Sequence, residues 1–180
     1  MFEKKRGEVM ESIKVKETID LVTEYVKVNS LLMKLNKLIR YHLSDKSVLT
    51  DEEDEEYITD GHTDESKQYA ELRIKIGALH DRLFTSLQGL DYEEKNQVIG
   101  FINEKVKKYD IELEELRREV QEYYDVIKSN NPDKHGERLL AISKISVTAS
   151  RREEVEGYLM SYNSLKHYLG VLVLSTNKKK

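Results

Sequence analysis

Apolar side chains recur at alternating spacings of four and three residues along most of this chain, a pattern typical of long amphipathic α-helices. The first helix is predicted from about Ser12 to Leu43, a length of roughly 48 Å at 1.5 Å per residue. Leu31 and Leu38 widen its apolar stripe, so we expect it to contact more than one neighbour. The stripe itself consists of Leu21, Tyr25, Val28, Leu32, Leu35, Ile39 and His42.

Two further helices are predicted at Asp64–Gln88 and at about Tyr92–Ser129. Gly89 is predicted to end the first of them in the left-handed conformation, and Asp91 with Glu94 forms a capping box for the second. The apolar stripe of the first consists of Tyr69, Leu72, Ile76, Leu79, Leu83 and Leu87. The second has the longest heptad run of the chain: Ile102, Val106, Tyr109, Leu113, Leu116, Val120, Tyr123 and Ile127. Acidic residues and arginines, Glu112 among them, lie outside this seam, as expected for a solvated face.

The last third of the chain is predicted to start a new helix, with Asn131 as N-cap and Pro132 at the first helical position. Residues 139–149 mix apolar and hydroxyl side chains and fit either a helix or a strand; helix is favoured because no partner strand is evident. Ser150 and Glu153 form another capping box, which predicts a kink or a second helix start. Helical spacing resumes from Arg151 to about Leu174, and the basic tail 175–180 is expected to be frayed.

An acidic segment at 44–64 interrupts the helical pattern. Residues 44–65 contain ten acidic residues and one base, a net charge of −9. The run Asp51–Glu56 does not match an EF-hand calcium loop, because Glu56 stands where that loop needs a glycine. We interpret the segment as an exposed acidic linker, with a charged latch or a docking site for a basic partner as the alternative.

The composition favours an elongated fold. Charged residues make up 36% of the chain and hydrophobic residues 38%, so a large solvated surface is needed around a narrow core. We therefore predict an all-α protein, a single domain over residues 1–180 that forms an elongated antiparallel helical bundle or coiled coil of four to five helices. A dimer paired along the first and third helices is the alternative.

The absence of cysteine excludes disulfides and a cysteine nucleophile, and it suits the cytoplasm. The longest apolar stretch, Tyr168–Leu174, is too short to span a bilayer. No phosphate-binding loop, dinucleotide fingerprint or nucleophile elbow is present. None of the five histidines has a glutamate three residues before it, as helical di-iron sites require. We expect neither enzymatic activity nor a metal or other cofactor.

One pair of residues suggests an enzymatic function as an alternative. Arg73 and His80 are seven residues apart on one face of a predicted helix. This pair resembles the active pair of the HEPN ribonucleases, although Ile74 stands where a polar residue usually follows the arginine. The resemblance covers eight positions and implies that His80 exchanges a proton with a 2′-hydroxyl while Arg73 holds the scissile phosphate.

The leading hypothesis is association with a protein partner or self-association, as in an adaptor, an assembly chaperone or a structural subunit. The C-terminal helix is rich in tyrosine and ends in an apolar run that something must cover. Its predicted partner-binding residues are Tyr158, Tyr162, Leu165, Tyr168, Leu169 and Leu172.

The second hypothesis is a small helical subunit of a nucleoprotein complex. From Pro132 onward the chain has nine bases and five acids, a net charge of +4. Lys144, Arg151 and Arg152 are the predicted phosphate-binding residues, because basic side chains displace the counterions of nucleic acids. No recognition helix or aromatic stacking pattern accompanies them.

Overall fold

The protein is an all-α bundle. The computed structural model describes residues 12–44, 64–129 and 135–177, with the backbone alone at 41–44 and 171–177. These ranges contain four helices and no strand: α1 (Ile13–Ser44), α3 (Asp64–Gln88), α4 (Tyr92–Lys128) and α5 (His135–Asn177). The predicted helices are confirmed. The predicted acidic linker, the cap at Asn131–Pro132 and the last three lysines lie outside the described residues.

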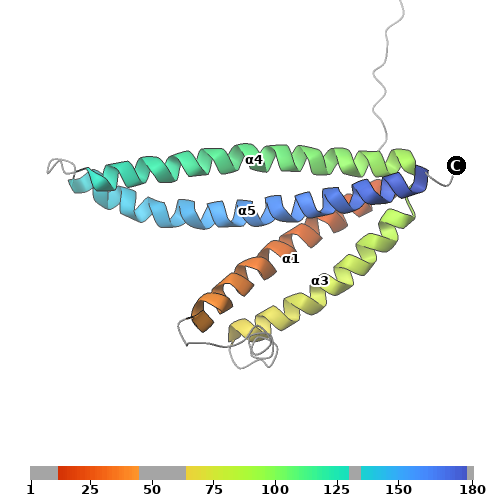
Figure 1. Ribbon diagram of the computed structural model, residues 1–180, viewed down its shortest axis with the longest axis horizontal. Helices are drawn as coiled ribbons and strands as arrows, with labels where there is room; N and C mark the ends of the chain where they lie inside the picture. The colour runs from red at the N-terminus through yellow and green to blue at the C-terminus, as the bar shows by residue number, and fades with distance from the viewer. Residues whose placement is uncertain (1–11, 45–63, 130–134, 178–180) are drawn as a thin grey trace, which may run out of the picture.

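The four helices form two antiparallel hairpins that diverge from a common end (Figure 1). Helices α4 and α5 lie side by side along their whole length, while α1 and α3 pair with each other and slant away from α5. The first residues of α1 and α4 and the last residues of α3 and α5 meet at the common end, which we call the closed end. The α4–α5 hairpin continues past the departure of α1 as a two-helix outer arm, residues 113–128 and 135–150.

The main core fills the closed end and draws on all four helices. Its most deeply buried members include Val22 of α1, Leu87 of α3, Ile102 of α4 and Leu169 of α5. A smaller apolar cluster around Ile39 joins α1 to Tyr69 of α3 farther out. Burial of this apolar surface, at about 25 cal/mol per Å², is the main stabilising contribution.

Side-chain hydrogen bonds cap the N-terminus of α4 at the closed end. The Asp91 side chain accepts from the Glu94 amide at 2.8 Å and the Glu94 side chain accepts from the Asp91 amide at 3.0 Å, which confirms the predicted capping box. The Ser12 hydroxyl donates to Glu94 at 2.7 Å and so ties the start of α1 to the start of α4. The prediction for Gly89 was wrong: its φ lies outside the left-handed region, and its backbone N–H donates to the carbonyls of Thr85 and Ser86.

The stripe predicted for α4 is confirmed, because all eight of its residues are buried or half-buried. In α1 the most buried residues include Val15, Val22 and Val26, which the predicted stripe missed. Leu31 and Leu38 remain 49% and 45% exposed, since α1 leaves α5 in this region. The expectation that this helix contacts more than one neighbour is confirmed.

Helix α5 runs without a break over 43 residues, so residues 139–149 are helical and the predicted kink or second start at Ser150 was wrong. Ala141, Thr148 and Val155 are buried along the side that faces α4, on both sides of the predicted break. This continuous packing holds the helix together, because tertiary burial outweighs the local preference of a capping pair.

Candidate functional site

Helices α1 and α5 cross at a point of close approach between small residues. Gly157 of α5 is buried against Ser30 of α1, and a β-carbon placed on Gly157 would overlap the Ser30 hydroxyl and lie 3.2 Å from its β-carbon. The side-chain amide of Asn29 donates to the Ser161 hydroxyl at 2.9 Å, and that hydroxyl donates to the backbone carbonyl of Gly157 at 2.8 Å. Beyond this crossing, α1 departs from α5 (Figure 1).

A cleft of about 480 Å³ opens beside the crossing, between α1 and the start of the outer arm. Its walls combine apolar, hydroxyl and charged side chains. The lining residues are Ser30, Leu31, Lys34, Ser146, Val147, Ser150, Arg151, Glu154 and Tyr158. On the other side of the crossing, Lys37 of α1 forms an ion pair of 3.1 Å with Glu153 of α5.

Arg151 organises the floor of this cleft by joining α5 to α4. Its Nε and Nη2 atoms lie 2.8 and 2.6 Å from Oε1 of Glu112, and its Nη1 atom donates to Glu154 at 2.7 Å. Tyr158 donates to the other oxygen of Glu154 at 2.7 Å. The Tyr158 and Arg151 hydrogen bonds hold the pKa of Glu154 below its usual value. Sequence reasoning assigned Glu112 to the solvated face; it is instead half-buried, because Arg151 reaches it across the hairpin.

Three tyrosines continue this network into the core. The Tyr109 ring lies 5.4 Å from that of Tyr158 and 5.9 Å from that of Tyr162, measured between centroids. Burial, followed by the hydrogen bond to Glu154, raises the pKa of Tyr158 to about 12. Burial, followed by the proximity of Tyr109, raises the pKa of Tyr162 to about 12.

These tyrosines make stability sensitive to alkaline pH. Because the folded-state pKa values exceed the usual value of 10.0, the stabilisation is present below pH 10 and is lost as the pH rises toward 12. We expect Tyr162→Phe to reduce this fall in the free energy of unfolding, measured by urea denaturation between pH 9 and 12. Tyr124→Phe removes an exposed hydroxyl and is the matched control. An equal fall in wild type and Tyr162→Phe would contradict the assignment.

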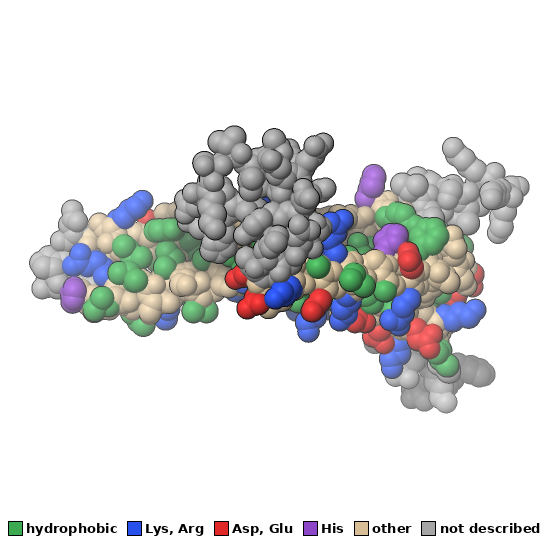
Figure 2. All heavy atoms as spheres, turned by 90° about the horizontal axis from the view of Figure 1, so that it is seen from below, with side chains coloured by type: hydrophobic (Ala, Val, Ile, Leu, Met, Phe, Trp, Pro, Cys, Tyr) green, Lys and Arg blue, Asp and Glu red, His purple; other side chains and the backbone are tan. Residues whose placement is uncertain are grey.

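The outer arm exposes large apolar side chains that no described helix covers. Leu139, Leu140, Ile142 and Val147 of α5 are each more than half exposed, and Val147 is the most exposed at 71%. Figure 2 shows hydrophobic side chains along the outer arm with some basic side chains among them, whereas most of the acidic side chains on this side lie over the rest of the molecule.

Small residues follow one face of α5 at intervals of seven. They are Gly136, Ser143, Ser150, Gly157 and Ser164. A seven-residue spacing keeps side chains on nearly the same face of a helix, since the drift is about 20° per heptad. Helix α1 crosses this face at Gly157, and Gly136, Ser143 and Ser150 continue it along the outer arm. The seven-residue spacing of these glycines and serines is the signal in the sequence that locates this face.

The predicted partner-binding residues are mostly used within the chain itself. Tyr162, Leu165 and Leu169 belong to the core at the closed end, and Tyr158 and Tyr168 pack against it. The bundle's own helices therefore cover the apolar surface that was assigned to a partner. The side chain of Leu172 lies outside the described residues.

The predicted phosphate-binding residues do not form a cationic cluster. Arg151 is held by two carboxylates, and the Nε atom of Arg152 lies 3.7 Å from Glu156. Lys144 is exposed on the outer arm, about two helical turns from Arg151. The charges of both arginines are thus matched by acids of the same chain.

Arg73 and His80 both lie exposed on α3. Within the described residues no hydrogen bond or ion pair joins them. The His80 ring packs near Tyr25 and Phe84, with centroids 6.5 and 6.4 Å away, and its Nδ1 atom lies 3.6 Å from Asp81.

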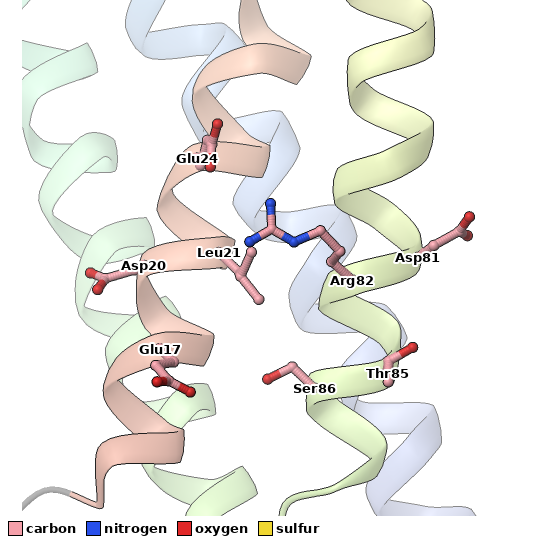
Figure 3. Close-up of a pocket in the computed structure, with 8 residues that line it drawn as sticks. All are labelled: Glu17, Asp20, Leu21, Glu24, Asp81, Arg82, Thr85 and Ser86. Atoms are coloured by element: carbon pink, nitrogen blue, oxygen red, sulfur yellow. The ribbon is translucent and has the colours of Figure 1, made fainter.

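A second groove, of about 750 Å³, lies between α1 and α3 (Figure 3). Arg82 points across it toward α1, while Asp81 and Thr85 point away from it on the far side of α3. Glu24, on the α1 wall, forms an ion pair of 3.2 Å with Lys75 of α3. Across the described ranges, no group of three or more histidine and acidic side chains is arranged to hold a metal ion.

The described residues form an all-α bundle of four helices, with a two-helix arm that none of the other described helices covers. No known family model matches the chain, and neither a curated protein nor a solved structure gives a significant match. Among the described helices, none combines the length and the apolar character needed to cross a membrane.

Proposed function

We propose that this protein is a non-enzymatic adaptor or assembly factor that binds a helix of a partner protein along the outer arm of α5. The proposal rests on one observation: the face of α5 that packs against α1 at Gly157 continues into the outer arm, where no described helix covers it. Gly157 on this face accepts α1 in close contact, and Ser150 and Ser143 lie one and two heptads farther out with no described helix over them.

The chemistry of the uncovered face suits an amphipathic helix. Leu139 on one side of the small residues and Leu140 and Val147 on the other offer exposed apolar surface, which is the arrangement that binds a helix in a groove. Small residues allow close approach of two helices, and the apolar flanks supply the buried area. Between Leu139 and Ser150 the face extends over roughly 16 Å, or about three helical turns.

The charges around the cleft favour acidic residues on the partner helix. Glu153 is paired with Lys37, and Glu154 is bound by Arg151 and Tyr158. Lys34 and Lys144 have no ion-pair partner among the described residues. A partner helix with carboxylates at its edge would therefore meet unpaired cations, which speeds encounter and orients the helix.

Site-specific photo-crosslinking in the native host tests this proposal. A photoreactive phenylalanine analogue at Val147 is expected to yield a crosslinked product whose mass spectrum identifies the partner segment. The same analogue at Glu115, which is exposed on α4, is the matched control and should yield none. No product at Val147 beyond that control would contradict the proposal, and a product joining two copies of this chain would replace the adaptor role with self-association.

A further inference from the structure

A third cavity, of about 150 Å³, lies at the closed end and is separate from the cleft beside α1 and the outer arm. Helices α1, α3 and α5 each contribute to its wall. The lining residues are Tyr25, His80, Leu83, Phe84, Leu87, Ser164, Leu165 and Tyr168. None of them is an acid, a lysine or an arginine.

Four ring side chains form a continuous row beside this cavity. Tyr25 of α1 lies 6.5 Å from His80 of α3, His80 lies 6.4 Å from Phe84, and Phe84 lies 5.9 Å from Tyr168 of α5, all between centroids. The row thus links three helices through ring contacts. Aromatic rings at such separations favour tilted or offset contacts with a further ring.

Three leucines provide the deep part of the cavity lining. Leu83, Leu87 and Leu165 are 2%, 1% and 7% exposed, so they belong to the core rather than to the surface. At the outer part, the hydroxyls of Tyr25 and Tyr168 have no hydrogen-bond partner among the described residues. The cavity therefore combines an apolar interior with a small number of free polar groups, as ligand sites commonly do.

We propose that this cavity binds an uncharged, ring-sized aromatic group, such as a phenyl or phenol ring. An apolar cavity of about 150 Å³ has room for a benzene-sized molecule. The leucines disfavour a charged group, because they would remove it from water without offering a counter-charge. The ring can come from a free small molecule or from a side chain of a partner, and this inference does not depend on the proposed function.

An NMR titration of the full-length protein with phenol tests the site. Phenol is expected to shift the resonances of the cavity-lining residues with a Kd of roughly 1 mM, because so few atoms make contact. Ser164→Leu places a side chain at the cavity from an exposed position, so the fold should be retained while phenol affinity falls at least about tenfold. Asn163→Leu places the same leucine side chain at an adjacent exposed residue outside the lining and should leave the affinity unchanged.

The possible outcomes test three things in turn: whether the site exists, whether it prefers an uncharged ring, and where that ring comes from. No saturable shift with phenol, or equal affinity in Ser164→Leu and Asn163→Leu, overturns the site. Tighter binding of tetramethylammonium than of phenol overturns the assignment to an uncharged ring, since a cation would then be preferred. Binding of both phenol and N-acetyltyrosine amide supports the site and assigns it to a partner's side chain, whereas binding of phenol alone supports the site and assigns it to a free molecule.

Discussion

Replacing Gly157 with leucine is expected to separate α1 from α5 and to lower the free energy of unfolding by about 3 kcal/mol. Even a β-carbon at this position would overlap the Ser30 hydroxyl, so the longer side chain has no space at the crossing. The hydrogen bond from Asn29 to Ser161 spans the same crossing and would be lost with it. Urea denaturation followed by circular dichroism measures the loss of stability.

A glycine elsewhere in the bundle provides the control for this substitution. Gly100 of α4 is exposed, and nothing lies within 4 Å of the β-carbon it would gain. Gly100→Leu is therefore expected to stabilise the protein by about 0.5–1 kcal/mol through helix propensity alone. If Gly157→Leu were as stable as Gly100→Leu, the close approach of α1 and α5 would be refuted.

Exchanging the two small residues at the crossing tests the contact directly. Gly157→Ala alone introduces the overlapping β-carbon, and Ser30→Gly removes both of the side-chain atoms that it would meet. We expect the double variant to recover at least about 1 kcal/mol of the stability that the two single changes lose when added together. Simple additivity of the single changes would show that the residues do not touch.

Replacing Leu169 with alanine is expected to lower the free energy of unfolding by about 2–5 kcal/mol. Leu169 is fully buried in the core at the closed end, so the change leaves a cavity that the surrounding helices cannot fill. Thermal and urea unfolding measure the loss.

Leu140→Ala is the matched comparison, because it removes the same atoms from the same helix at a position that is 55% exposed. Its effect on the isolated protein should stay within about 0.5 kcal/mol. The two variants should also differ in their effect on association: Leu140→Ala weakens binding of a partner helix while the protein remains folded. Equal destabilisation by both changes would mean that Leu140 is covered in solution.

The sequence determined the secondary structure and the class of the fold. The seam of α4 repeats every heptad, and tertiary packing uses the same residues that the spacing predicts. The capping box at Asp91 and Glu94 also followed from local sequence, because both hydrogen bonds lie within one helical turn. Periodicity and capping are short-range properties, and they can therefore be read without knowing which helices become neighbours.

Only the tertiary structure decided which apolar faces are covered. Leu31 and Leu169 both belong to apolar helical spacing, yet one is half exposed and the other is fully buried. The difference arises because α1 leaves α5 beyond the contact of Ser30 with Gly157, whereas Leu169 lies in the part of α5 that packs within the core at the closed end. Because core packing buries Tyr162, Leu165 and Leu169 of the C-terminal end of α5, the partner surface that we propose lies on the outer arm instead. Helix periodicity specifies which residues share a face, whereas the packing angle between helices depends on contacts between residues more than a hundred positions apart, such as Asn29 and Ser161.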